Sequence, residues 1–529
     1  MRYAKKCAAI ALVAVFVGST PSPAIAQGQT GGVRKLTVDE AVKLAVEQNL
    51  GIQIERVNPQ IQDVAVAQAR SYWVPTFSST LQNNSQNSPS TSFLSGGQAK
   101  TTDTKFSTQF GVSQILSTGA NYSLAWNSGR STSTNQFTNF DPLLSSNLAF
   151  NISQPLWRNR TIDSYRQQLL TTRKDRDAAD VSLRATIAGT ARNVKNAYWD
   201  LAYARENLQA QRQSLDLAKR ALADNEKRVQ IGTMAPIDIV EAQSEVARNE
   251  EVVIVAEAAI SQAEDRLRAL ILNPSAPDFW TTSLEPSEPM PFTAVAVDVD
   301  SAIKKAIDNR TDVQLAKNSI EKSDISLKYF RTQVLPDISA NLAYQTNGVG
   351  GAQLSPITSF TGTQAPRSVV AQRGYGTVLG DVLTNQYPTW TFGVTVSYPI
   401  GASTQETNLA RAKLQYDQAN SQLKNLEMQV GTQVRDAARQ VQTNAKRVDS
   451  ARVARDLAEQ KLAAEEKKFA AGIQISFFVF QAQRDLAQAR TNEIKAIADY
   501  NKSVVDYEAV QETSLTGNTP ITSAATGIR

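Results

Sequence analysis

An apolar residue stands at every seventh position of a long stretch of the chain, from about residue 161 to residue 231. The positions are Ile187, Val194, Leu201, Leu208, Leu215, Leu222 and Val229. A seven-residue apolar repeat keeps one face of a helix against a partner along its whole length. Because the stretch has no proline and only one interior glycine, Gly189, the pattern predicts a single helix. At about 1.5 Å per residue this helix would be roughly 105 Å long.

The same pattern appears again 240 residues further along the chain, at Val434, Val441, Val448, Leu462 and Phe469. Arg455 interrupts this second repeat, because it occupies the position that corresponds to Leu215. A glycine follows each long stretch, Gly232 in the first copy and Gly472 in the second, and an apolar heptad pattern then resumes. In the second copy these later heptad positions are Val479, Leu486, Glu493, Tyr500 and Tyr507. The sequence therefore predicts two long helical hairpins related by duplication.

A second duplicated block lies before each hairpin. Its apolar positions are Val38, Ala41, Val42, Ala45 and Val46 in the first copy, and Val299, Ala302, Ile303, Ala306 and Ile307 in the second. This spacing predicts a short amphipathic helix. In the first copy we expect another helix that starts near Ile52 or near Asn58, with Pro59 as a kink or a restart, and that ends at Tyr72. Two copies in register over about 40 residues indicate an internal duplication.

Between Thr76 and Pro155 the apolar period changes from that of a helix to that of a strand. Ser, Thr, Asn and Gln dominate, charged residues are scarce, and aromatic and aliphatic residues alternate with polar ones. Alternation over segments of about ten residues is typical of membrane β-strands. We expect four such segments, of which the middle two are joined by a short turn at residues 117–119. Polar loops are expected at residues 83–92 and 130–138.

The second copy has two segments of this kind, over about residues 337–345 and 389–399, separated by a long loop rich in Gly, Thr and Gln. One copy therefore has too few strands to close a barrel, and open strand edges cannot face lipid. Closure needs both copies and, in addition, several chains. The expected fold class is mixed α and β, a duplicated repeat of long antiparallel helical hairpins that form an α-barrel tunnel, with strands of a shared transmembrane β-barrel.

The first 26 residues are expected to be a secretory signal peptide. Arg2, Lys5 and Lys6 form a basic start, residues 8–18 form a short apolar core, and residues 24–26 fit a small-residue cleavage site. The apolar core is too short to span a membrane, and no later stretch has 18 apolar residues in a row. If the chain enters a membrane, it enters as a β-barrel.

These patterns divide the chain into five parts. The signal peptide, residues 1–26, is followed by a first structural repeat, residues 27–272, with strands over about 73–156 and a helical hairpin over about 161–272. A linker rich in proline and acidic residues, 273–294, leads to a second repeat, 295–513, with strands over about 336–400 and a hairpin over about 402–513. The last part is a tail, 514–529, which is expected to be disordered.

The composition excludes most kinds of catalytic chemistry. The chain has no histidine, and its only cysteine, Cys7, lies in the expected signal peptide. The mature chain therefore has no disulfide, no thiolate nucleophile and no histidine-ligated metal. Without the three basic residues of the signal, the formal net charge falls from +5 to +2, which argues against a nucleic-acid partner. Gly374-Tyr375-Gly376 is not a nucleotide loop, because no strand and helix are expected around it. We expect no enzyme activity, cofactor or metal.

Short motifs recur in the same order in both copies. They are the strand-entry motifs Trp73-Val74-Pro75 and Val334-Leu335-Pro336, the strand-to-helix motifs Gln154-Pro155-Leu156-Trp157 and Ser397-Tyr398-Pro399-Ile400, and the tips that run from Gly232 to Gln243 and from Gly472 to Gln483. Through these motifs the chain resembles the TolC family of outer-membrane efflux and secretion channels, over about residues 36–513.

The resemblance implies a homotrimer whose protomers share one β-barrel in outer-membrane lipid, above an α-helical tunnel in the periplasm of a Gram-negative-type cell. It implies the function of a passive outer-membrane channel of a tripartite efflux or type I secretion system. The implied partners are a periplasmic adaptor (membrane fusion) protein and an inner-membrane transporter. The alternative is a soluble periplasmic coiled-coil adaptor without a barrel. The exported cargo stays open among drugs, metal ions, polysaccharide and protein.

The first copy departs from the family in its number of strands. The family generally places two strands of each repeat in the barrel, whereas four alternating segments are expected here in the first copy. Two further strands would give six per protomer and about 18 in a trimer, and therefore a wider pore. The alternative is that the middle hairpin folds over the mouth outside the membrane.

The two tips are the expected docking site for the adaptor, through Gly232, Thr233, Pro236, Asp238, Gly472, Ile473 and Ser476. Asp238 has an alternative role, which is to favour the N-terminus of the helix behind it. In the family the second tip commonly has aspartates that line a constriction. Here the candidate constriction is Phe477, Phe478, Phe480 and Gln481, which would gate by dewetting. Packing inside the coil is the alternative for the three phenylalanines.

Four tryptophans lie near the expected strand ends: Trp73, Trp126, Trp157 and Trp390. Tryptophan is enriched where a membrane barrel meets the water interface, so they are candidates for an aromatic girdle. Ordinary packing is the alternative.

Overall fold

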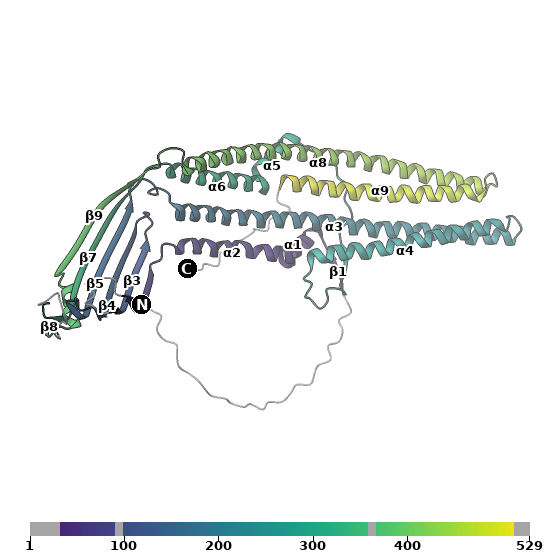
Figure 1. Cartoon of the computed structure of the whole chain (residues 1–529). Helices are drawn as coiled ribbons and strands as arrows, with labels where there is room; N and C mark the ends of the chain where they lie inside the picture. The colour runs from purple at the N-terminus through teal and green to yellow at the C-terminus, as the bar shows by residue number, and fades with distance from the viewer. Residues whose placement is uncertain (1–31, 90–98, 358–366, 513–529) are drawn as a thin grey trace, which may run out of the picture.

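The computed structural model describes residues 32–89, 99–357 and 367–512. The molecule is elongated, with a β-sheet at one end and long helices that run from it to the opposite end (Figure 1). The expected signal peptide, residues 1–26, and the expected disordered tail, residues 514–529, lie outside the described residues.

Two helices of 67 residues run most of the length of the helical part: α3 (Ser164–Gln230) and α8 (Thr404–Ala470). Each is followed by a return helix, α4 (Ile237–Ile271) or α9 (Ser476–Gln511). The heptad prediction is confirmed, since most seam residues are buried, among them Ile187, Val194, Leu201, Val434, Val441 and Val448. Towards the tips the seam is half-buried, at Leu215, Leu222, Val229 and Phe469.

Side-chain caps fix the start of both long helices. The side chain of Asp163 accepts a hydrogen bond from the N–H of Arg166, 2.7 Å away, at the start of α3. Ser403 and Glu406 form a capping box at the start of α8. Both devices satisfy backbone donors that the first helical turn leaves free. Each long helix therefore starts a few residues after its strand-to-helix motif.

Four shorter helices lie beside the long ones: α1 (Val38–Gln48), α2 (Leu50–Ser71), α5 (Val299–Asn309) and α6 (Thr311–Gln333). Helix α2 packs on α3, and α6 packs on α8 (Figure 1). Asn49 caps α2, which begins before either of the predicted starts. Pro59 is buried inside this helix, which has no restart there. Both copies therefore share the helical pattern predicted from the duplicated block.

A small two-stranded sheet joins the start of the first copy to the linker and was not predicted. Strand β1 (Val33–Leu36) pairs in parallel with β6 (Ser283–Pro286), which lies in the expected linker. The buried Tyr198 of α3 holds this sheet, because its hydroxyl donates to the carbonyl of Leu36 at 3.0 Å. Tyr500 of α9 holds the same linker further on, donating to the carbonyl of Thr293 at 2.7 Å. The linker is therefore fastened to both hairpins.

The large sheet contains six long strands, in the order β2-β3-β4-β5-β7-β9. Their bounds are β2 (Thr76–Pro89), β3 (Lys100–Ile115), β4 (Asn121–Ser133), β5 (Phe140–Pro155), β7 (Asp337–Leu354) and β9 (Tyr387–Ser397). All neighbours are antiparallel. The four alternating segments expected in the first copy are thus four strands of one sheet.

The prediction of loops at residues 83–92 and 130–138 is partly wrong. Strand β2 continues to Pro89 and β4 continues to Ser133. Backbone hydrogen bonds make the ladder, so it extends past the point where apolar alternation stops. Polar runs of Ser, Thr and Asn can therefore be strand as well as loop.

The long loop of the second copy contains two further elements, β8 (Val369–Arg373) and α7 (Tyr375–Leu383). A strand and a helix therefore do surround residues 374–376, contrary to the expectation. Strand β8 is antiparallel to β7, so the parallel strand–helix unit of a nucleotide loop is still not formed.

Helix α7 packs closely on the sheet because two strand residues lack a side chain. A Cβ atom on Gly348 would lie 2.2 Å from the carbonyl oxygen of Val378, and one on Gly350 would lie 2.5 Å from a methyl group of Val378. Arg373 and Asp381 join β8 to α7 through an ion pair of 2.8 Å. The glycines therefore determine where this helix docks.

The one mismatch in the heptad of α8 has a partner. Arg455 lies against Glu493 of α9, with 3.2 Å between Nε and Oε2. Glu493 occupies the matching heptad position of the return helix, and its side chain is only 15% exposed. Two charges that each interrupt an apolar stripe therefore form an ion pair within the seam.

We predict that Arg455→Leu alone lowers the free energy of unfolding by about 1–3 kcal/mol, because Glu493 then keeps a weaker partner inside the seam. The cation left beside Glu493 is Arg452, whose Nε lies 3.7 Å from Oε1 of Glu493. The double variant Arg455→Leu/Glu493→Leu should recover the stability of the parent or exceed it, since well-packed apolar residues replace a mostly buried ion pair without loss. Chemical denaturation in detergent measures both. Additive losses in the double variant would contradict the pairing.

Candidate functional site

One face of the large sheet is apolar across all six long strands. Residues directly opposite one another in neighbouring strands point to the same face, so the register identifies the members. One row that crosses the whole sheet reads Phe77, Val112, Leu124, Phe150, Tyr344 and Trp390. Most of these side chains are exposed in the single chain. A continuous exposed apolar surface of this kind indicates contact with a partner or with lipid.

The opposite face is polar. The row that crosses the same strands one residue further along reads Thr76, Ser113, Ser123, Asn151, Ala343 and Thr391. Side-chain hydrogen bonds cross between strands on this face, for example from Asn127 to Asn147 at 2.7 Å and from Asn341 to Thr395 at 3.1 Å. A hollow of about 430 Å³ lies here, and its lining includes Ser113, Ser123, Asn151 and Asn341. The polar face is therefore hollowed and suits contact with water.

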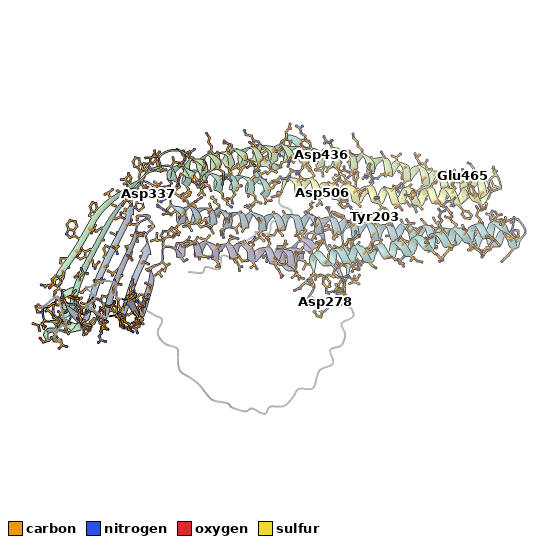
Figure 2. The ribbon with its side chains drawn as sticks, viewed as in Figure 1. Tyr203, Asp278, Asp337, Asp436, Glu465 and Asp506 are labelled. Atoms are coloured by element: carbon orange, nitrogen blue, oxygen red, sulfur yellow. The ribbon has the colours of Figure 1, made fainter. Side chains whose placement is uncertain are left out.

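Two of the four girdle candidates belong to the apolar face. Trp390 is 69% exposed, and Trp126 stacks on Phe110 with the ring centroids 5.6 Å apart. Trp73 and Trp157 lie outside the strands, at the ends of β2 and β5 nearest the helices. Asp337, which begins β7, marks this junction of sheet and helices in Figure 2.

The two hairpin tips have the same backbone geometry. Gly232 has φ of +77° and Gly472 has φ of +72°, a conformation that side chains disfavour. The N–H of Thr233 donates to the carbonyl of Arg228 at 2.9 Å, and the N–H of Ile473 donates to that of Lys468 at 3.0 Å. These bonds satisfy carbonyls at the end of each long helix. Both glycines are exposed, so both tips are open to a partner.

The tips of the two hairpins touch each other. The hydroxyl of Ser476 lies 3.2 Å from a carboxylate oxygen of Asp238. Arg484 pairs with the buried Glu245 at 3.0 Å. The guanidinium of Arg228 lies 4.7 Å from the ring centroid of Phe469. Asp238 also lies in the first turn of α4, where its charge favours the helix N-terminus, the alternative role considered for it. Its contact with Ser476 in addition joins the two hairpins.

The candidate constriction residues have different surroundings. Phe480 is 3% exposed within the single chain, which favours packing over a pore role for this residue. Phe477 and Phe478 are each 43% exposed, with their rings edge to face and the centroids 5.6 Å apart. Gln481 is exposed. The structure thus leaves three of the four residues available to line a passage.

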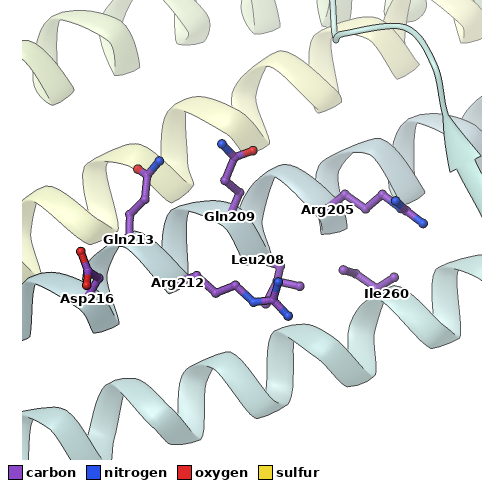
Figure 3. A pocket seen from close by; sticks show the side chains of 7 residues that line it. All are labelled: Arg205, Leu208, Gln209, Arg212, Gln213, Asp216 and Ile260. Atoms are coloured by element: carbon purple, nitrogen blue, oxygen red, sulfur yellow. The ribbon is translucent and has the colours of Figure 1, made fainter. Parts of the chain in front are cut away.

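A pocket of about 620 Å³ lies between α3 and α4 (Figure 3). Its cations already have partners: Arg205 pairs with Glu264 at 3.1 Å and with Glu285 at 3.2 Å, and Arg212 pairs with Glu257 at 2.7 Å. No free charge is left there for an anionic ligand. The pocket is a groove of the helical hairpin, and nothing in it indicates a reaction.

Three ionisable groups whose pKa is raised by burial lie in one packing region. Burial raises the pKa of Glu206, and it raises the pKa of Tyr198 and of Tyr203, which is labelled in Figure 2. All three lie on one stretch of α3. In the part of the chain that the structure describes, no cluster of three His, Cys, Asp or Glu side chains suits a metal ion. Within the same residues, no helix combines the length and the apolar character needed to cross a bilayer.

The model of one protein family, described as outer membrane efflux protein, matches residues 116–271 and 302–509, more than half of the chain. The chain therefore belongs to the outer membrane efflux protein family. It is an outer-membrane efflux channel, as the duplicated motifs predicted, and the alternative of a soluble adaptor is not supported. Comparison with curated proteins gives no match.

Solved structures share the fold at low sequence identity. A membrane protein from Pseudomonas aeruginosa is 14% identical, with a TM-score of 0.63 over 93% of this chain and 99% of that one. The MtrE outer membrane channel of Neisseria gonorrhoeae, in its open state, is 15% identical, with a TM-score of 0.60 over 94% and 98%. The CmeC outer membrane channel of Campylobacter jejuni is 14% identical, with a TM-score of 0.59 over 94% and 93%. The predicted fold class is confirmed.

We predict that Ser476→Ala/Arg484→Ala loosens the contact between the tips. Each change removes a hydrogen bond to a carboxylate, worth about 1.5–3 kcal/mol. Together the two changes should shift an equilibrium between joined and separated tips towards separated tips by about a hundredfold or more. Single-channel recording in planar bilayers measures the open fraction. Arg490→Ala is the matched control, because Arg490 pairs with Glu459 inside one hairpin, at 2.8 Å. An equal effect of both variants would refute a specific role for the tip contact.

Proposed function

We propose that three copies of this chain form a passive conduit across the outer membrane and the periplasm, in a tripartite efflux or type I secretion system. The observation that carries the proposal is a two-faced sheet, apolar on one side and polar on the other, at the end of long helical hairpins. The apolar face suits lipid and the polar face suits a water-filled lumen. The hairpins would continue that lumen as a helical tunnel.

The two edges of the sheet support assembly of several copies. Within the described residues, β2 pairs only with β3, and β9 pairs only with β7. Each of these long strands has one side of unpaired backbone groups, which cannot face lipid. Since β2 and β9 run in opposite directions, β9 of one copy can pair with β2 of the next. Repetition of this contact closes a barrel.

The helices beside these edges support the same assembly. Helix α2 leads into β2 and exposes an apolar stripe at heptad spacing, Leu50, Ile54, Val57, Ile61 and Val64. Helix α8 follows β9 and exposes Leu414 and Met428. Edge pairing would bring α2 of one copy to α8 of its neighbour. An apolar heptad stripe that is bare in one chain is suited to a helical partner.

The exposed tips are the proposed contact with a periplasmic adaptor protein, through Gly232, Thr233, Pro236 and Asp238 on one hairpin and Gly472, Ile473 and Ser476 on the other. Ile473 is 75% exposed, which favours an apolar contact at this site. The energy for export would come from an inner-membrane transporter, so this chain has only to provide the passage. We assign it no catalytic residue.

We predict that the mass measured in detergent corresponds to three chains, and that Ile54→Asp/Ile61→Asp prevents this assembly. A charge at each position would have to be buried against the neighbouring helix, which costs several kcal/mol. Gln60→Asp is the control, because it alters an exposed polar residue of the same helix and should leave the trimer intact. A stable folded monomer of the parent chain would sink the proposal of a shared barrel.

Replacing both tip glycines, Gly232→Val and Gly472→Val, should abolish export while trimers still assemble. A β-branched residue is strained at positive φ by about 1–2 kcal/mol or more, so the adaptor would meet an altered tip. Neither site has a neighbouring atom within 4 Å of a new Cβ, so the change should stay local. Export assays and detergent mass measurements together provide the test. Unchanged export would count against docking at the tips.

A further inference from the structure

The hairpin of β3 and β4 is paired along its whole length with the rest of the sheet. Strand β3 pairs with β2 from Thr76 opposite Ser113 to Pro89 opposite Lys100. Strand β4 pairs with β5 from Asn121 opposite Ser153 to Ser131 opposite Leu143. A hairpin that folded over the mouth would leave β2 and β5 to pair with each other. Instead β3 and β4 separate them.

The β3–β4 hairpin continues both the apolar face and the polar face of the sheet. Phe110, Val112, Leu124 and Trp126 point to the apolar face, together with Leu148 and Phe150 of β5. The residues between them, Gln109, Gly111, Ser123 and Ala125, point to the polar face. A segment exposed to water on both sides would not need such alternation. The pattern is that of a wall with lipid on one side and water on the other.

Side-chain contacts join the hairpin to both neighbours on the apolar face. The rings of Phe77 and Phe110 stack with their centroids 6.4 Å apart, and those of Phe110 and Trp126 with their centroids 5.6 Å apart. The indole N–H of Trp126 donates to the hydroxyl of Ser146 in β5, at 2.8 Å. One continuous row of contacts therefore crosses β2, β3, β4 and β5.

The turn between β3 and β4 lies at the helical end of the sheet. Gly119 of this turn has φ of +85°, and a Cβ atom added to it would lie 3.0 Å from the carbonyl of Asn159 and 3.3 Å from Pro155. Pro155 ends β5, and Asn159 lies in the strand-to-helix junction that follows. The hairpin therefore extends down to the level at which the helices begin, as the other strands do.

We propose that the β3–β4 hairpin is part of the lipid-facing channel wall, so that each protomer has six strands and the trimer closes a barrel of 18. The inference rests on the trimeric conduit proposed above. Barrel diameter grows roughly linearly with strand number, so this barrel is about 1.5-fold wider than one made of four strands per protomer. The cross-section of the lumen is at least twofold larger, by about the square of that ratio.

The chemistry of the wall indicates which solutes it suits. In the middle of the sheet the polar face has hydroxyl, carboxamide and small side chains, such as Gln109, Ser123, Asn127 and Asn151. Charged residues on this face lie towards the ends of the strands, Asp103 and Lys105 at one end and Asp337 at the other. Rings of charged side chains are what select ions by sign. The wide lumen therefore suits large hydrophilic solutes, with little discrimination by charge.

Helix α7 limits the lipid-facing band on one side of the sheet. It covers Gly348 and Gly350 on the apolar face of β7, at the end far from the helical hairpins. Strands β2 and β3 lie away from this cover, and α7 contacts β4 at Ser128, whose hydroxyl is hydrogen-bonded to the hydroxyl of Tyr375. Phe77, Leu81, Phe106 and Leu124 stay exposed. The lipid surface of the inserted hairpin is therefore continuous with that of β2.

Nitroxide labels on single cysteines test the position of the hairpin in the assembled trimer in lipid vesicles. The chain has no cysteine after Cys7, so each label is unique. Labels at Phe110→Cys and Leu124→Cys should be reached by oxygen from the lipid, like the β5 reference Phe150→Cys. The matched labels Gln109→Cys and Ser123→Cys should be reached by a water-soluble nickel chelate. Access of the nickel chelate to all four hairpin sites, with Phe150→Cys still in lipid, would overturn the inference.

Deletion of residues 100–133 tests the width. Removing two strands leaves β2 and β5 antiparallel and joined by 16 residues, so a barrel of 12 strands can close. Poly(ethylene glycol)s of graded mass, added on the side of the barrel in planar bilayers, should enter the parent channel up to a hydrodynamic radius about 1.5-fold larger than in the deletion variant. An equal cut-off in both would refute a wall position.

The two proposals fail in different ways. Absence of trimers or of any conductance from the full chain would refute the conduit itself. Trimers that conduct, with hairpin labels in water or with an unchanged polymer cut-off, would refute only the wider barrel. If the deletion variant does not assemble, the labels on the full chain still decide the question.

Discussion

The unpaired backbone groups along β2 and β9 are the constraint on which the rest of the structure depends. A sheet in lipid has no water to satisfy its edges, so each edge must find another strand. The chain meets this requirement with a duplicated repeat whose first and last long strands run in opposite directions. In the proposed assembly, pairing of these edges would place α2 of one copy beside α8 of the next, because α2 leads into one edge and α8 leaves the other. In this assembly, closure of the sheet and packing of helices between copies would therefore occur together.

The heptad seam transmits this geometry over the length of the molecule. Seam residues such as Val194 and Val448 are fully buried, so each hairpin is stiff between the sheet and the tip. Where the seam contains charge, at Arg455 and Glu493, the two charges meet each other. The contacts between hairpins near the far end, at Ser476 and Arg484, are polar and few. A stiff helix with a weakly joined end is suited to local opening at the tip.

The barrel and the tips would have different functions in the proposed conduit. The polar face of the sheet has little charge in its middle, so the barrel imposes little selection by sign. The tips have exposed aromatic residues, Phe477 and Phe478, beside a polar contact between hairpins. In the proposed conduit, selection and gating would therefore fall to the tips and to the adaptor proposed to dock there. A wider barrel would change the size of what leaves the cell and would leave control at the tips unaltered.

The sequence by itself determined the elements that depend on local periodicity. Heptad spacing predicted both long hairpins, and alternation predicted the six long strands, because burial along a helix or a strand repeats with a fixed period. The tip glycines were predicted for the same reason, since a positive φ is a local property. Pairing across the chain was beyond such reasoning. The β1–β6 sheet, the docking of α7 and the contact of Ser476 with Asp238 join segments far apart in sequence. The place of the β3–β4 hairpin in the sheet was also left to the tertiary structure, because alternation shows that a strand has two faces and only its neighbours show which sheet it joins.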